Sequence, residues 1–258
     1  MFKQALKAIL FLFCGLIFSS QTYAQWTIPW QMRSEVTLDH LLSSNGTAKP
    51  DLSFGNSMAI GSTFGHNYID QKWNNCSILL FDSQKLIEGY LAKYDIGENK
   101  LAVKSKGGTK LIEVTKIKSI VWLDSLTMAP RYFINAKDYK ENNVQLSGLL
   151  EVLVDGQMPL LARSYLKEKE VGFFAGVFSL FDKEKREKKY EVDKVFYVGN
   201  SNSISKISAK KEFLLSFGDF YWEMEEYIEK NNLNISAQSG LQKVFEYYNT
   251  KFERLPDY

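Results

Sequence analysis

Metal binding and acid–base catalysis depend most often on histidine, and this chain contains only two, His40 and His66. Both lie in an N-terminal region without a regular hydrophobic pattern, and neither stands beside residues that could complete the three or four ligands of a metal site. We interpret His66, between Gly65 and Asn67, as a turn residue. His40 follows Asp39 in a short apolar segment, and we interpret it as structural. The sequence predicts no metal site.

Nucleophilic catalysis would need an activated serine or cysteine, and the sequence contains no G-x-S-x-G motif. Cys76 has no basic partner near it in sequence and directly precedes an expected strand, so we interpret it as a small buried hydrophobic residue. Gly107 and Gly108 lie between two expected strands, whereas a phosphate-binding loop would precede a helix. We therefore assign no catalytic residue, no cofactor and no cofactor-binding residue.

Two carboxylates brought together by the fold could serve a glycosidase, but nothing in the sequence marks a particular pair. The densest group of carboxylates lies along one expected helix. We interpret it as the solvated face of that helix: Glu223, Glu225, Glu226 and Glu229.

Aromatic side chains could stack on sugar rings, as they do in carbohydrate-binding modules, and the candidates are Trp73, Trp122 and Trp222. Packing in the core is the simpler interpretation, because aromatic residues dominate burial in domains of this kind. We therefore expect these three side chains to fill the core.

The first 24 residues have the three-part layout of a secretory signal peptide. Lys3 and Lys7 give a positive N-terminus, residues 8–18 form an apolar run, and Ala24 places a small side chain at the expected cleavage site. The run is shorter than the roughly 20 residues that span a bilayer, so we expect export and no transmembrane segment. The competing interpretation is a lipoprotein signal acylated at Cys14, although a bulky residue precedes it and the apolar run continues past it.

Cleavage after Ala24 would change both the charge and the cysteine content. It would remove two of the 32 basic residues and none of the 30 acidic ones, which leaves a neutral chain with no electrostatic attraction for nucleic acid. Cys76 would be the only remaining cysteine, so no intramolecular disulfide is expected in an oxidising destination. Stability must then come from the hydrophobic core.

The elements that would position any site follow from the hydrophobic pattern, which divides the chain into four parts. They are a signal peptide (residues 1–24), a loop-rich N-terminal segment (25–76), an antiparallel β domain (77–200) and a C-terminal helical tail (201–258). We expect an α+β, mainly β fold, with an antiparallel meander sheet or half-barrel followed by a bundle of about three short helices. The expected strands are residues 78–81, 86–94, 100–104, 110–114, 117–123, 131–134, 149–154, 158–165 and 190–198.

Local patterns refine the β domain. Asp155 and Gly156 join two apolar runs and predict a two-residue type I′ hairpin. Residues 86–94 carry apolar groups on both faces, so this strand should be covered on both sides. Residues 182–189 form a charge run of mixed sign, and we interpret it as a solvated loop.

Three helices are expected in the tail. Ser208 would cap the first, which Gly218 ends; Asp219 would cap the second, which continues to Lys230; and Ser236 would cap the third. The third helix carries an apolar stripe at helical spacing: Leu241, Val244, Phe245 and Tyr248. Helices this short are marginal alone, so the stripes must pack on each other or on the sheet.

Several stretches resemble a group of exported Bacteroidetes proteins whose activity is uncharacterised. They are LIEGYLAKYD (86–95), LLEVLVDGQMPLLAR (149–163), KISAKKEFLLSFGD (206–219), YIEKNNLNIS (227–236) and FEYYN (245–249). The resemblance implies an envelope protein with a β-rich body and a small helical tail, and it transfers no catalytic residue. Residues 25–75 and 172–181 fit it poorly.

We therefore expect a non-catalytic exported protein that binds or scaffolds in the periplasm or at the outer envelope, with an envelope protein or an apolar ligand as its partner. The alternative is a periplasmic carrier of a lipid or other apolar ligand in a curved sheet, with the apolar residues 172–181 as a lid. An envelope hydrolase is the third possibility, and it would need ionisable groups that converge in a cleft.

Overall fold

A computed structural model describes residues 27–43, 52, 56–57, 67–168, 190–200, 202–208 and 210–253 of the 258-residue chain. Several predictions concern residues outside these ranges, namely the signal peptide with Cys14, His66, and the apolar and charged stretches of residues 172–189. They stay predictions.

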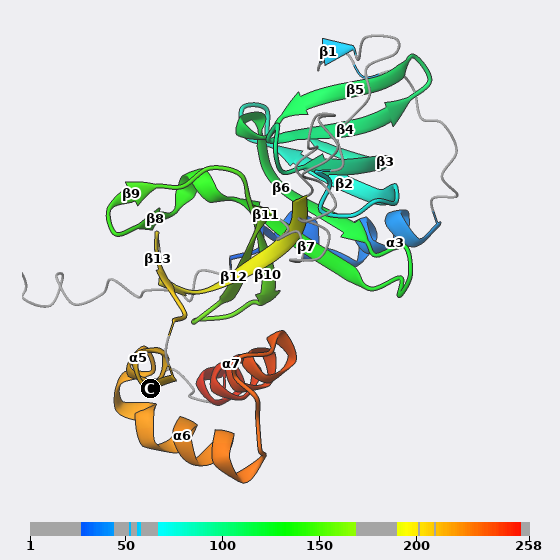
Figure 1. Ribbon diagram of the computed structural model, residues 1–258. Helices are drawn as coiled ribbons and strands as arrows, with labels where there is room; N and C mark the ends of the chain where they lie inside the picture. Colours follow the sequence, from blue (N-terminus) through cyan, green and yellow to red (C-terminus); the bar gives the residue numbers. More distant parts are fainter. Residues whose placement is uncertain are drawn as a thin grey trace, which may run out of the picture.

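Thirteen strands of the described residues form one large mixed sheet that does not close on itself (Figure 1). Their order is β1-β5-β4-β3-β2-β6-β7-β10-β11-β12-β13-β8-β9. One contact is parallel, between Ser203 of β13 and Lys140 of β8, so the sheet is mixed where a purely antiparallel one was predicted. The strands are β1 (Asn56–Ser57), β2 (Asn74–Leu80), β3 (Leu86–Asp95), β4 (Lys100–Ser105), β5 (Gly108–Glu113), β6 (Ile117–Leu123), β7 (Pro130–Asn135), β8 (Lys140–Glu141), β9 (Val144–Gln145), β10 (Leu149–Val154), β11 (Leu160–Glu168), β12 (Tyr190–Asn200) and β13 (Ser203–Lys206).

The strand order departs from a single meander at β2. Strands β2 to β5 follow one another outward, and the chain then returns so that β6 pairs with the other edge of β2. A short 3-10 helix, Val114–Lys116, makes this return, and the side chain of Asn135 donates hydrogen bonds of 2.7 Å to the carbonyl oxygens of its first residue, Val114, and of Ile117, which follows it. A hydrophobic pattern locates strands but does not say which edge of β2 the next strand joins.

A bulge in β3 explains why apolar residues occur at both odd and even positions of this strand. Cys76 pairs with Tyr90 and Ser77 with Glu88, so Gly89 is an extra residue on β3. Its φ of 73° lies in the left-handed region that glycine adopts at such bulges. The bulge reverses the alternation, and Ile87 and Tyr90 therefore both face the same apolar cluster.

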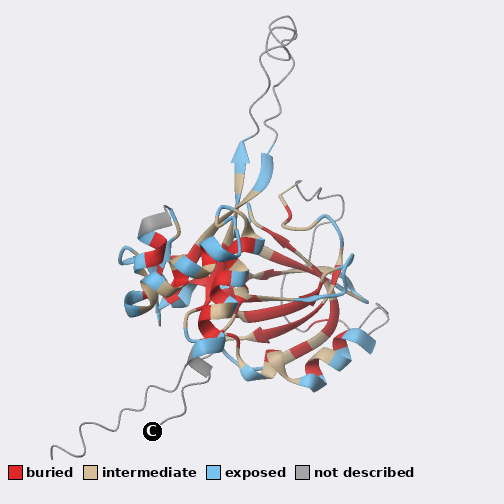
Figure 2. Ribbon diagram, turned by 90° about the horizontal axis from the view of Figure 1, so that it is seen from below, coloured by how far each residue is buried: buried red, intermediate tan, exposed pale blue. Residues whose placement is uncertain are grey.

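Both faces of the central strands are buried (Figure 2). Adjacent residues alternate between two clusters, with Ile78, Ile120, Phe133 and Leu149 in one, and Leu79, Val121, Ile134 and Leu150 in the other. The first cluster is filled by side chains of β2 to β7, which include Trp122 and Phe133 with ring centroids 4.3 Å apart. We call the side of the sheet that carries this first cluster the inner face.

Two helices cover the other face, where the sequence predicted loop. They are α2 (Trp30–Arg33) and α3 (Glu35–Ser43), and α3 packs on β2, β3 and β6. The hydroxyl of Ser34 accepts a hydrogen bond from the backbone N–H of Thr37, which is the capping arrangement that starts a helix. The prediction was wrong because the buried side of α3 contains Thr37 beside Leu41, and a threonine does not mark an apolar stripe.

Three helices follow β13 in the described residues: α5 (Lys210–Leu215), α6 (Tyr221–Lys230) and α7 (Gln238–Glu253). The predicted stripe of α7 is buried at all four positions, and it joins side chains of α5, α6 and three strand residues (Val154, Leu160 and Val198) in a third cluster. Two cap predictions were wrong. Asp219 lies within a 3-10 helix, Gly218–Phe220, that precedes α6, and Ser236 lies two residues before the first residue of α7. Neither residue is therefore the N-cap of the helix that follows it.

The hairpin between β10 and β11 exists, but its loop spans residues 155–159 and is not the predicted type I′ turn. Asp155 has no positive φ; its carboxylate instead accepts hydrogen bonds from the backbone N–H groups of Thr27, Ile28 and Gly156. Asn249 of α7 bonds both to the N–H and to the C=O of Met158 at 3.0 Å. Contacts with distant segments therefore determine the conformation of this loop, and the local turn preference of its residues does not.

Candidate functional site

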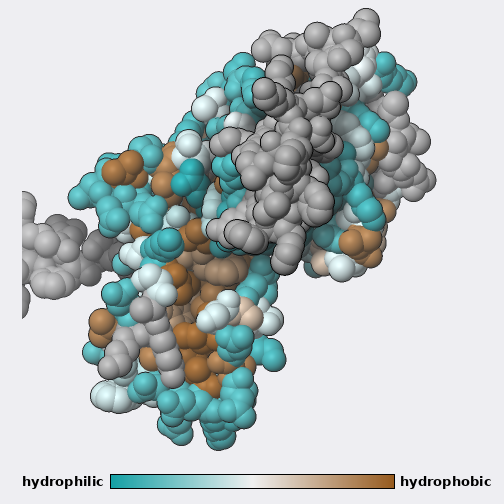
Figure 3. Space-filling view, viewed as in Figure 1, coloured by the Kyte–Doolittle hydropathy of each residue, from teal (hydrophilic) through white to brown (hydrophobic). Residues whose placement is uncertain are grey.

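The inner face of the sheet changes from apolar to charged where β7, β10 and β12 approach the start of α7. A groove of about 380 Å³ lies there, and we call it the junction groove. Its lining residues come from all four elements: Pro130, Arg131, Glu151, Val152, Leu153, Lys194, Gln238 and Gln242. Figure 3 shows apolar side chains gathered between the sheet and the C-terminal helices.

Strand register brings three charged residues together in this groove. Glu151 lies opposite Phe133 on β7, so Arg131 is its diagonal neighbour on the same face. On the other side Glu151 lies opposite Ala162, which in turn lies opposite Phe196. The small side chain of Ala162 leaves room for Lys194, two residues before Phe196, to reach across β11.

Glu151 forms two ion pairs, one with each oxygen. The Nε of Arg131 donates to Oε1 at 2.7 Å, and the Nζ of Lys194 donates to Oε2 at 2.9 Å. The residue is only 6% exposed, and burial alone would raise its pKa, but the two cations outweigh burial and hold the pKa of Glu151 below its ordinary value. The carboxylate therefore stays ionised at neutral pH.

Further contacts hold the two cations in place. The guanidinium of Arg131 lies 5.7 Å from the ring centroid of Trp122 and 5.3 Å from that of Phe133, and its NH1 is 3.8 Å from a carboxylate oxygen of Asp124. The Nζ of Lys194 also donates to Oε1 of Gln238, the first residue of α7, at 3.2 Å. The groove is thus a rigid polar site between two apolar clusters.

This arrangement suits ligand binding better than proton transfer. A general acid or base works best with a pKa near the operating pH and with a free lone pair or proton aimed at the ligand. Both oxygens of Glu151 are occupied and its pKa is lowered, which is the opposite of what a catalytic acid needs. What the groove offers is fixed cations and amide groups.

The histidine and cysteine candidates lie outside this groove. His40 is exposed on α3, with its Nδ1 3.3 Å from a carboxylate oxygen of Glu88. Cys76 is fully buried and is not in a disulfide, and burial raises the pKa of its thiol, so its interpretation as a buried hydrophobic residue is confirmed. Within the described ranges, no three His, Cys, Asp or Glu residues come together as a metal site.

The three tryptophans have different surroundings. Trp122 is completely buried, as predicted, and its indole Nε1 has no hydrogen-bond partner among the described residues. Trp73 is half-buried, with the ammonium groups of Lys93 and Lys104 at 5.2 and 4.5 Å from its ring centroid. Trp222 is 76% exposed on α6, so its predicted place in the core was wrong.

The glutamates of α6 are not a reactive cluster. Glu223 accepts hydrogen bonds from Tyr247 and Lys251 of α7, which lower its pKa, and Glu226 and Glu229 are exposed.

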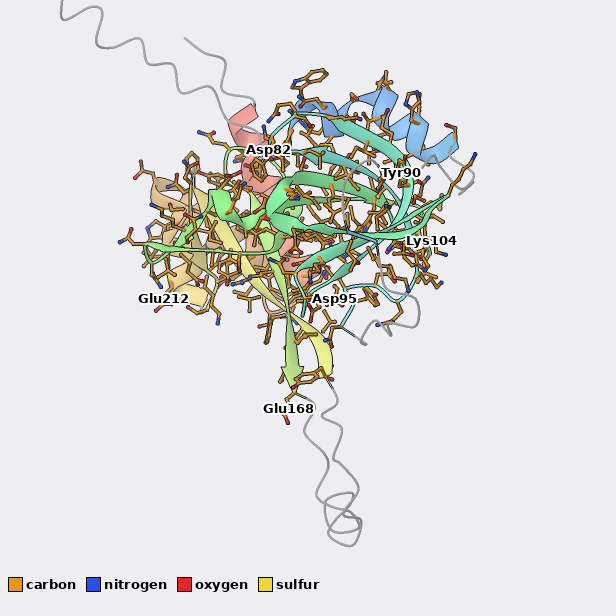
Figure 4. All side chains as sticks on the ribbon, turned by 90° about the horizontal axis from the view of Figure 1, so that it is seen from above. Asp82, Tyr90, Asp95, Lys104, Glu168 and Glu212 are labelled. Carbon is orange, nitrogen blue, oxygen red and sulfur yellow. The ribbon has the colours of Figure 1, made fainter. Side chains whose placement is uncertain are left out.

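The view in Figure 4 shows the labelled Glu212 of α5 and Lys104 of β4 on opposite sides of the molecule.

Sequence analysis missed Arg131, Glu151 and Lys194. One signal was present: Glu151 is the only charged residue in the apolar run LLEVLV of residues 149–154. A lone carboxylate inside a strand that is buried on both faces requires a partner, which should have directed attention to cations on neighbouring strands.

No protein-family description, curated protein or solved structure matches this chain. In the part of the chain that the structure describes, every helix is too short or too polar to cross a membrane. The chemistry of the junction groove is therefore argued from its own residues.

Proposed function

We propose that this chain is a non-catalytic binding or scaffolding protein, exported to the periplasm or the outer envelope, and that the junction groove is its ligand site. The observation that carries the proposal is the double ion pair of Glu151. It fixes two cations at the wall of a groove while removing the one buried carboxylate there from proton transfer.

The export part of the proposal is supported by the sequence of residues 1–24 and by the resemblance of residues 86–95, 149–163, 206–219, 227–236 and 245–249 to exported proteins. A single buried cysteine also suits an oxidising compartment, because it has neither a disulfide partner nor an exposed thiol.

The scaffolding part is supported by the C-terminal helices, which we propose to act as one small bundle. Two large apolar side chains project from them into solvent, Leu215 at 68% exposure and Trp222 at 76%. Aromatic side chains such as that of Trp222 are enriched where proteins bind one another. The bundle would then present a surface to a partner while the N-terminal end of α7 completes the junction groove.

The carrier alternative has weaker support. It needs a continuous apolar cavity, whereas the inner face between β2 and β7 is filled by the first cluster, and the junction groove exposes mainly polar groups. A hydrolase would need a titratable group that is free to donate or accept a proton, whereas the carboxylate of Glu151 in the groove is held in two ion pairs.

The test is to block the groove without touching its charges. Pro130 is exposed and lines the groove, so Pro130→Trp places a large ring in it at little cost to the core. Leu126→Trp is the matched control, because Leu126 is 76% exposed in the neighbouring β6–β7 loop but does not line the groove.

The protein without its signal, residues 25–258, is screened by saturation-transfer NMR against amino sugars, short peptides and fatty acids. We expect at least one class to bind, Pro130→Trp to abolish that binding, and Leu126→Trp to retain it. The proposal fails if Pro130→Trp and Leu126→Trp bind every compound alike. It also fails if a compound is converted to product by the wild type and not by Glu151→Gln.

A further inference from the structure

We propose that the junction groove recognises an oxyanion, the carboxylate or phosphate group of a small organic ligand, between the side chains of Arg131 and Lys194. This inference rests on the proposed function, because both place the ligand in the same groove. It adds the chemical class of the ligand.

Hydrogen-bonding capacity is the first argument. A guanidinium has five N–H donors and an ammonium three. In the described part of the chain Arg131 donates one hydrogen bond, to Glu151, and Lys194 donates two, to Glu151 and Gln238. Each oxygen of Glu151 already accepts one of these. The groove therefore has donors in excess of acceptors, and a ligand that only accepts hydrogen bonds would complete it.

Charge is the second argument. Among the residues that line the groove, Arg131 and Lys194 are cations and Glu151 is the single anion. Asp124 pairs with Arg131 from outside the groove, with its Oδ2 3.8 Å from NH1, while its Oδ1 accepts hydrogen bonds from Leu126 and Thr127 of its own loop. Within the lining itself two cations therefore face one anion, which favours a ligand of negative charge.

The position of α7 adds to this charge. Gln238, which lines the groove, is the first residue of this 16-residue helix, so the positive end of its dipole lies at the same place. In its first turn the N–H groups of Gly240 and Leu241 already donate to the carbonyl oxygen of Ala237, so the helix contributes through its dipole. The cation pair and the helix end thus favour the same sign of ligand charge.

Accessibility and preorganisation complete the case. The side chains of Arg131 and Lys194 are 22% and 29% exposed, so both reach the groove from the protein side while Glu151, at 7%, stays beneath them. Both cations are already held in place, Arg131 by Glu151 and two aromatic rings, and Lys194 by Glu151 and Gln238. Little side-chain entropy is therefore lost when an anion binds. Pro130 and Leu153 provide an adjacent apolar surface for the rest of a small organic ligand.

The experiment titrates the protein of residues 25–258 with acetate, inorganic phosphate and acetamide, and follows amide NMR shifts of Leu153, Gln238 and Gln242. Acetamide is the neutral counterpart of acetate. We expect saturable shifts with acetate, phosphate or both, and none with acetamide. Acetate alone would identify a carboxylate ligand and phosphate alone a phosphorylated one.

Two lysine variants separate the groove from general charge effects. Lys194→Met removes one donor of the proposed site, and we expect the dissociation constant of the anion to rise about tenfold, the usual loss for one charge-assisted hydrogen bond. Lys167→Met removes the same charge from an exposed position on β11, and we expect it to bind as the wild type does.

The inference is overturned if acetamide shifts the same amides as acetate, or if Lys194→Met and Lys167→Met weaken binding equally. A neutral ligand that binds in the groove and is blocked by Pro130→Trp would overturn the oxyanion inference and leave the proposed function standing. The proposed function itself fails when blocking the groove changes no binding at all, or when Glu151 proves to be needed for conversion of a compound.

Discussion

At the scale of the single residue, Glu151 explains how this sheet tolerates a charge inside it. An isolated carboxylate at this depth would take up a proton, because burial penalises the charged form. Arg131 and Lys194 prevent this by donating to one oxygen each, and Arg131 in turn lies against the rings of Trp122 and Phe133. Removal of Glu151 leaves both cations without this partner, and removal of either cation leaves one oxygen of Glu151 without its donor.

We predict that Glu151→Gln lowers the free energy of unfolding at neutral pH by about 2 kcal/mol. This is below the cost of breaking a fully buried pair, because Arg131 and Lys194 partly reach solvent. The pKa of Glu151 in the folded chain lies below the ordinary value of 4.5, so its ionisation stabilises the protein fully above that pH. The stabilisation is lost as the pH falls through the lowered folded-state pKa. The difference between wild type and variant should therefore shrink on acidification below pH 4.5.

Urea unfolding at a series of pH values measures this difference. Glu191→Gln is the matched control, because Glu191 is an exposed glutamate on β12 and should show no difference from the wild type near neutral pH. A gap between wild type and Glu151→Gln that stays constant from neutral to acidic pH would contradict the ion-pair origin of the stabilisation.

At the scale of the element, the sequence predicts where strands and helices lie along the chain better than it predicts which elements they pack against. The strand β6 begins and ends at the residues predicted, and the stripe of α7 is buried at all four positions, since side-chain alternation and helical spacing are local properties. The pairing of β6 with β2 and the helix α3 were not predicted. Both depend on contacts between residues far apart in sequence, and the groove, made where β7, β10, β12 and α7 meet, was missed for the same reason.

The loop between β10 and β11 gives a prediction at this scale. Gly156 has a φ of 143°, and a Cβ added there would lie 2.6 Å from the Cγ of Asn249. Gly156→Ala therefore suffers both backbone strain and a clash with the side chain that holds Met158, and we expect it to cost about 1–3 kcal/mol in chemical unfolding. Gly108→Ala is the control for strain alone, because Gly108 also has a positive φ and has open space around its added Cβ.

A double-mutant cycle separates the clash from the strain. In an Asn249→Ala background the clash is absent, so Gly156→Ala should cost less there than in the wild type, with a coupling of about 1 kcal/mol. Strictly additive costs would show that Asn249 does not limit this position. Gly108→Ala, measured in the same two backgrounds, should be additive.

At the scale of the whole molecule, the inner face of the sheet connects its parts. It carries the first cluster between β2 and β7, then the charged residues of the junction groove, and then Val154, Leu160 and Val198, which pack against the C-terminal helices. Away from this face, β11 and β12 extend as a two-stranded arm with Glu168 at its end (Figure 4). Because the third cluster contains residues of both sheet and helices, the helical tail and the β domain share one core there.

This shared core predicts that sheet and helices open together. Leu241 of α7 is buried in the third cluster, and Leu241→Ala should cost about 2–4 kcal/mol because it leaves a cavity. Native-state hydrogen exchange should then speed up by a similar factor for amides of α7 and for amides of β10 and β12. Trp222→Ala, at an exposed position on α6, should change neither set. Faster exchange confined to α5, α6 and α7 would mean that the helices are a separate cooperative unit, and that the groove between them and the sheet can open without unfolding the strands.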